Sequence, residues 1–126
     1  FVEGLWEQDV AELFVMAPSG RYQEFNLSPT GAWWCALFSG YREKETTLPD
    51  LPVTIENSRD ETSWSVKLSL PIQALVVLEN TSWHEALWNA TAILDPGRPV
   101  YLCWGQQNGN QPDFHRADNF LPANLE

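Results

Sequence analysis

Strict alternation of apolar and polar residues is clearest over residues 62–70, TSWSVKLSL. Side chains of a strand point alternately to opposite faces, so this pattern predicts an antiparallel strand with one face toward a core and one toward water. The apolar positions are Trp64, Val66, Leu68 and Leu70. We expect them to face inward.

Residues 22–34, YQEFNLSPTGAWW, predict two strands joined by a tight turn. One face of the first strand carries a ring, a carboxylate and an amide, from Tyr22, Glu24 and Asn26. The proline and glycine that follow break the strand, because proline fixes φ and supplies no donor, whereas glycine tolerates turn geometry. An apolar run continues the chain at once. The segment therefore predicts a hairpin whose polar and aromatic face is the best candidate for a ligand surface.

Residues 6–16, WEQDVAELFVM, fit two interpretations. Val10 and Phe14 lie at helical spacing, but both sets of alternate positions are also apolar, as in a strand covered on both faces. Because the rest of the chain predicts β structure, we interpret this segment as a strand. Glu12 lies between the two apolar residues, and a buried carboxylate is costly unless it is paired. Its partner could be a ligand, a metal or a structural group such as Arg42.

The remaining segments complete an all-β pattern. The charged segment 42–50 predicts an exposed loop, and 71–78 predicts one short helical turn after its proline. Further strands are expected at 53–56, 86–94 and 100–104. Short strands separated by Gly/Pro turns predict a single domain over residues 1–126, an antiparallel β-sandwich of jelly-roll or immunoglobulin-like type.

Composition excludes several classes of protein. The formal net charge of −10 disfavours binding to nucleic acids and to anionic membranes, and no apolar run is long enough to span a bilayer. Seven tryptophans are more than packing requires, and their flat faces suit ligands. Cys35 and Cys103 are too few for a disulfide scaffold or a cysteine zinc site, so we expect two reduced, buried thiols. The chain begins without a signal peptide, which favours a cytoplasmic location.

Several motifs resemble one family. LWEQDVAELFV, then YQEFNLSPTGAWW with the following FSGYR, and the late QPDFHRADNF are similar to motifs of bacterial DOMON-like domains related to family-nine carbohydrate-binding modules. The resemblance implies a β-sandwich whose relatives hold a sugar between tryptophan side chains, often with structural calcium. It also implies that the N-terminal strands of the full family domain are missing here or are supplied by another chain.

A sugar site needs flat aromatic faces and side chains that hydrogen-bond hydroxyl groups. We therefore expect a non-catalytic carbohydrate-binding module with no cofactor of its own. The alternative is a structural or protein-interaction module that forms a homodimer or is completed by another chain. The expected ligand-binding residues are Trp6, Glu12, Tyr22, Glu24, Asn26 and Trp34.

Other chemistry is disfavoured. Asp113, His115 and Asp118 could ligate a metal, but they are better interpreted as part of a latch in which nearby phenylalanines pack down and polar groups fix a turn. Haem binding needs axial ligands, and the only methionine, Met16, alternates with core residues. Glu12 and a second carboxylate on the next strand could serve a glycosidase, but acidic residues are abundant and no cleft is evident from the sequence.

Overall fold

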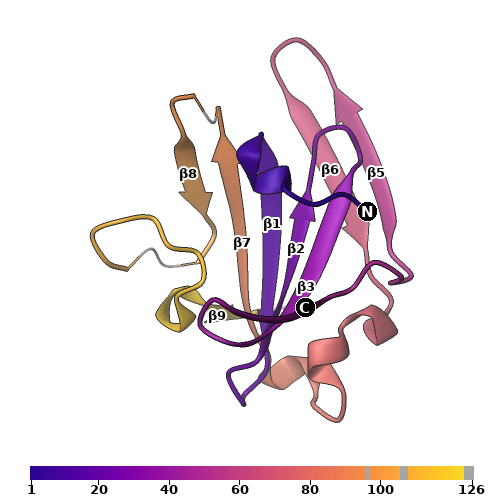
Figure 1. The fold of residues 1–126 in the computed structure, drawn as a ribbon, viewed down its shortest axis with the longest axis vertical. Coiled ribbons are helices and arrows are strands. Elements are labelled where there is room, and N and C mark those ends of the chain that lie inside the picture. The colour runs from indigo at the N-terminus through magenta and orange to yellow at the C-terminus, as the bar shows by residue number, and fades with distance from the viewer. Residues whose placement is uncertain (96, 106–107, 124–126) are drawn as a thin grey trace.

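The computed structural model describes residues 1–95, 97–105 and 108–123 (Figure 1). The described residues form nine strands and five short 3-10 turns, and no helix among them is long and apolar enough to cross a membrane. The strands are β1 (Val10–Met16), β2 (Tyr22–Leu27), β3 (Trp33–Gly40), β4 (Glu43–Thr47), β5 (Thr54–Arg59), β6 (Trp64–Ser69), β7 (Leu87–Leu94), β8 (Val100–Cys103) and β9 (Leu121–Pro122). The turns are η1 (Leu5–Glu7), η2 (Ile72–Ala74), η3 (Val76–Leu78), η4 (Trp83–Glu85) and η5 (Ala117–Asn119).

The strands form two antiparallel sheets. The larger has the order β4-β3-β2-β1-β7-β8, with β9 paired to β7 beyond the end of β8. The smaller sheet is the β5–β6 hairpin, whose Leu68 packs with Leu70 against one face of the large sheet. This arrangement confirms the expected all-β sandwich, and the alternation of half-buried and exposed residues along β6 confirms its predicted inward face.

The hairpin of β2 and β3 is formed as predicted. Its turn is closed by two backbone hydrogen bonds, from Ser28 N–H to the Ala32 carbonyl at 2.9 Å and from Gly31 N–H to the Ser28 carbonyl at 3.0 Å. Gly31 adopts φ 85°, which is left-handed backbone that glycine tolerates best. The predicted loop at 42–50 is wrong in part, because Glu43–Thr47 forms β4 and pairs with β3. Its side chains are polar because β4 is an exposed edge strand.

The central strand β1 is buried on both faces, which confirms the strand interpretation for Val10–Met16, with residues Leu5–Glu7 forming η1 instead. Each face of the large sheet has its own apolar core. The front face, as we call it, carries Phe14 and Tyr22, whereas the back face carries Val15 and Phe25. The hairpin β5–β6 and the turns η2 and η3 cover part of the back face.

The front face is covered instead by the ends of the chain. At the N-terminal end, η1 lies over the upper end of β1, as Figure 1 is drawn. At the other end, residues 108–120, the C-terminal strap, bury Phe114 and Phe120 in the front core. Asp113 accepts a hydrogen bond from His115 N–H at 3.2 Å, which fixes the turn in the strap. The predicted latch is thus confirmed.

No disulfide joins Cys35 to Cys103. Cys35 is buried in the back core and accepts a hydrogen bond from Gln23 Nε2 at 3.3 Å, whereas Cys103 is half-buried and packs against the front core. Because the two thiols lie on opposite faces of the sheet, they do not meet. The prediction of reduced thiols holds, although only Cys35 is fully buried.

Candidate functional site

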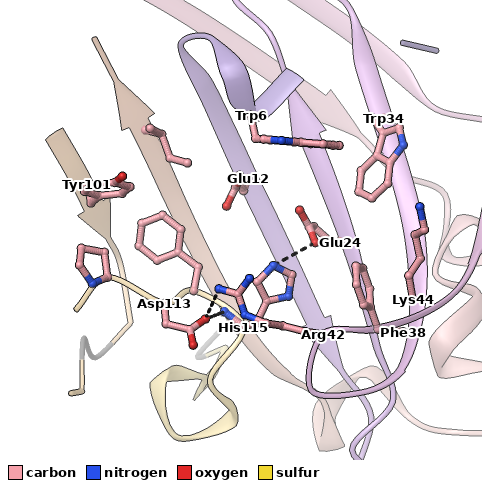
Figure 2. A pocket seen from close by; sticks show the side chains of 13 residues that line it. Trp6, Glu12, Glu24, Trp34, Phe38, Arg42, Lys44, Tyr101, Asp113 and His115 are labelled. Atoms are coloured by element: carbon pink, nitrogen blue, oxygen red, sulfur yellow. Dashed lines mark hydrogen bonds and ion pairs between the residues drawn. The ribbon is translucent and has the colours of Figure 1, made fainter. Parts of the chain in front are cut away.

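A cleft of about 390 Å³ opens on the front face between η1 and the C-terminal strap (Figure 2). Its volume lies within the usual range for ligand sites, roughly 300–1,000 Å³. The aromatic lining comes from η1, β3, β8 and the strap, and consists of Trp6, Trp34, Phe38, Tyr101 and Phe114. The charged lining consists of Glu12, Glu24, Arg42, Lys44 and Asp113.

The structure brings part of the predicted set to this cleft. Trp6 and Trp34 line it together with both predicted carboxyl groups. Tyr22 and Asn26 lie on the same face of β2, as the alternation predicted, but both are fully buried and neither lines the cleft. Of the six predicted residues, four thus line the cleft and two lie buried beside it.

Glu12 projects from the middle of β1 into the cleft. Its neighbour directly across in β7 is Thr91, whose hydroxyl donates a hydrogen bond to Glu12 Oε2 at 3.0 Å. Burial raises the pKa of Glu12 to about 7, although the Thr91 hydrogen bond lowers it. The structural partner suggested by the sequence, Arg42, is not the one found, because its guanidinium pairs with Asp113 instead.

Glu24 lies diagonally across from Glu12, because Phe14 is its direct partner on β1. Burial, and to a smaller extent the nearby charge of Glu12, raises the pKa of Glu24 to about 8. Neither polar atom of the Asn26 side chain has a hydrogen-bond partner of ordinary geometry among the described residues, but its amide still lowers the pKa of Glu24. One cleft thus holds two buried carboxyl groups that resist ionisation.

His115 reaches from the strap to the sheet. Its Nδ1 lies 2.7 Å from the Tyr22 hydroxyl, which itself accepts a hydrogen bond from Arg42 N–H at 3.0 Å. We assign the Tyr22 hydroxyl as the donor and Nδ1 as the acceptor of this bond. The proton of the neutral imidazole is then on Nε2, which lies 3.7 Å from Glu24 Oε2. Burial lowers the pKa of His115 to about 4, and the charge of Arg42 adds to this effect. The imidazole is therefore neutral near neutral pH and forms no salt bridge there.

The strap is anchored at the lower edge of the cleft by Asp113. The Asp113 carboxylate accepts hydrogen bonds from the Tyr41 hydroxyl and from Arg42 Nη2, the latter at 2.9 Å. Burial would raise the pKa of Asp113, but these two bonds lower it overall. The positive charge of Arg42 is thus paired with Asp113 inside the protein. Lys44, next to Phe38 in the β3–β4 register, has no carboxylate partner among the described residues.

The tryptophans form the opposite wall. The Trp6 and Trp34 rings meet edge to face, with centroids 5.7 Å apart and planes at 72°. Trp6 is 46 % exposed, so its ring remains available to a ligand, whereas Trp34 is buried behind it. Figure 2 shows both carboxyl groups in the space between the Trp6 ring and the His115 ring. The cleft can therefore offer a flat apolar face and hydrogen-bonding groups to one ligand.

Sequence reasoning missed several cleft residues. Lys44 was hidden in a segment expected to be a loop, although its alternation with Glu43 and Glu45 was a signal for an edge strand. His115 and Tyr101 come from segments far from β2 in sequence, and no local pattern indicates that they approach it. Among the described residues no group of three or more His, Cys, Asp or Glu side chains is placed to hold a metal ion. Asp118 points elsewhere, into an ion pair with Arg116 at 2.7 Å.

The chain matches no family model, no curated protein and no solved structure at a significant level.

Proposed function

We propose that this protein is a non-catalytic carbohydrate-binding module and that the front-face cleft is its binding site. The observation that carries the proposal is the half-exposed Trp6 ring facing buried carboxyl groups across a cleft of about 390 Å³. Sugars present apolar ring faces edged with hydroxyl groups, so a flat ring and polar side chains suit them together. The DOMON-like resemblance of the motifs that build this face supports the same function.

The carboxyl pair favours binding over hydrolysis. A glycosidase needs one protonated acid and one ionised base or nucleophile, held apart by environments that shift their pKa values differently. Here burial raises the pKa of both groups, to about 7 for Glu12 and about 8 for Glu24. At slightly acidic pH both are protonated, so neither would act as the base. Neutral carboxyl groups can instead donate as well as accept hydrogen bonds from sugar hydroxyls.

Removing the exposed ring should remove most of the binding. We expect Trp6→Ala to weaken binding of the best oligosaccharide by at least about tenfold, or roughly 1.4 kcal/mol, because the stacking face is lost. A glycan array followed by titration calorimetry measures this. The matched control is Trp104→Ala, since Trp104 is exposed and does not line the cleft. An array without hits, together with Trp fluorescence that sugars leave unchanged, would rule out the proposed function.

A second candidate is supported by the free edge at β8, where the function would be self-association. Val100, Leu102 and Trp104 are 51 %, 50 % and 56 % exposed, and among the described residues no strand pairs with the outer side of β8. Edge strands are usually protected by charge, as β4 is, whereas residues 100–103 carry none. The occupant that fits is a second copy of the chain, with β8 pairing to β8 about a two-fold axis.

Solution mass tests this second candidate. If β8 pairs with its copy, sedimentation equilibrium should give a dimer, and Leu102→Asp should convert it to a monomer by placing a charge at the apolar contact. Ile72→Asp is the matched control, because Ile72 is also an exposed aliphatic residue and lies in η2, away from β8. A monomer at all concentrations up to about 100 μM, where a weak dimer of micromolar Kd would form, would exclude it.

A further inference from the structure

Two carboxyl groups in the cleft lack a cationic partner. Glu12 is 7 % exposed and Glu24 is 5 % exposed, and both point into the open space of the cleft. Among the described residues no Lys or Arg nitrogen lies within ion-pair distance of either group, and His115 is neutral near neutral pH. A buried carboxyl group without a cation is costly to ionise. A cation supplied by the ligand would offset that cost.

The surroundings suit an ammonium group better than a metal ion. Although His115 lies beside Glu24, no group of three or more acidic, histidine or cysteine side chains among the described residues is placed to hold a metal ion. Aromatic rings line the same space, and the faces of such rings attract ammonium groups. The formal net charge of −10 also raises the local concentration of cations around the protein.

We propose that the ligand is an amino sugar whose protonated amine lies between Glu12 and Glu24 while its ring packs on Trp6. This inference rests on the proposed carbohydrate-binding function and names the class of sugar. A neutral sugar would use the carboxyl groups only as neutral hydrogen-bonding groups and would gain nothing from the charge that either can carry. An acidic sugar would place a second anion beside them, with only the exposed Lys44 to balance it.

The test compares two disaccharides of the same linkage, β-1,4-linked glucosamine and cellobiose, which differ at C2 in an amine or a hydroxyl group. Titration calorimetry at about neutral pH should show the glucosamine disaccharide binding at least about tenfold more tightly. The N-acetylated disaccharide, which has no charge, should bind like cellobiose. The other titratable groups around the cleft, Arg42, Lys44, Tyr101, Asp113 and His115, are the same in every arm.

Glutamine variants of the two carboxyl groups test whether these groups cause the preference for the amine. Glu12→Gln and Glu24→Gln should each reduce the ratio of glucosamine-disaccharide affinity to cellobiose affinity by at least about fivefold, because glutamine keeps the hydrogen-bonding shape and carries no charge. Lys44→Gln is the opposite-sign control, because it removes a positive charge from the cleft and should keep or increase the preference for the amine. A decrease in the preference with Lys44→Gln would overturn the inference, because removing a positive charge from the cleft should not weaken its attraction for an ammonium group.

A second readout needs no variant. Binding an ammonium group between the carboxyl groups holds one of them ionised. At about pH 6 the free amine is already protonated, so the complex should release protons, which calorimetry in phosphate and in Bis-Tris buffer measures. Cellobiose should release none. Equal affinity for the two disaccharides, without proton release, would overturn the amino-sugar inference and leave sugar binding intact. If neither disaccharide binds, the inference fails, and the glycan array separately decides the proposed function.

Discussion

The free energy of unfolding is expected to fall as the pH rises from about 4.5 to about 8, because over this range Glu12 and Glu24 ionise in the unfolded chain but keep their protons in the folded protein up to about pH 7 and 8. Burial raises their pKa values from 4.5 to about 7 and about 8. A carboxyl group with a raised pKa binds its proton more tightly in the folded state. Its stabilising contribution is complete below the unfolded pKa and is lost as the pH rises through the folded pKa.

The size of the loss follows from the shifts. Each pKa unit corresponds to about 1.4 kcal/mol, so each carboxyl group can account for a change on the order of 3 kcal/mol. His115 acts in the opposite sense, since burial lowers its pKa from 6.5 to about 4 and its contribution is lost as the pH falls through that range. Below about pH 6.5, His115 therefore offsets part of the loss of stability caused by the two carboxyl groups. Between about pH 6.5 and 8 it has no such effect, and the free energy of unfolding falls as the carboxyl groups dictate.

Urea unfolding across this pH range measures the effect. Glu12→Gln and Glu24→Gln should each flatten the alkaline decrease, because glutamine has no proton to lose. Glu61→Gln, in the exposed turn between β5 and β6, should keep the wild-type profile. If the wild-type protein were equally stable at about pH 6.5 and pH 8, the two carboxyl groups could not be buried and unpaired as described.

The sequence predicted the parts of the fold that depend on local alternation. The period of two in residues 22–27 correctly grouped Tyr22, Glu24 and Asn26 on one face, and the Pro-Gly turn correctly ended the strand. Alternation does not reveal how deeply a side chain on that face is buried. Tyr22 is buried because the strap covers it and bonds its hydroxyl through His115, a contact between residues 93 positions apart.

The cleft itself was beyond local patterns. No cleft that could raise a pKa is evident from the sequence, yet η1 and the strap create one by covering the two ends of the front face. Glu12 was correctly singled out as a carboxylate among apolar neighbours, but its partner Thr91 is 79 positions away, and only the pairing of β1 with β7 brings them together. Polar composition concealed β4, because an edge strand need not bury either face.

Phe120→Ala should destabilise the protein by about 3–5 kcal/mol, the usual cost of removing a buried phenylalanine ring. Phe120 is buried in the front core, where its ring lies 5.7 Å from that of Phe14 and 6.2 Å from that of Tyr22. Because it anchors the end of the strap, the same change should also weaken ligand binding, since His115 and Phe114 reach the cleft from that segment.

Urea unfolding and limited proteolysis check this prediction together. Phe1→Ala is the matched control, because the Phe1 ring is 42 % exposed and meets the Trp33 ring edge to face at the surface; we expect it to cost less than about 1 kcal/mol. Cleavage within residues 108–120 should become faster in Phe120→Ala and stay unchanged in Phe1→Ala. A Phe120→Ala protein as stable as the control would contradict the anchoring, because the ring would then contribute no packing to the front core. Loss of stability with an unchanged cleavage rate would instead show that Phe114 and Asp113 hold the strap without it.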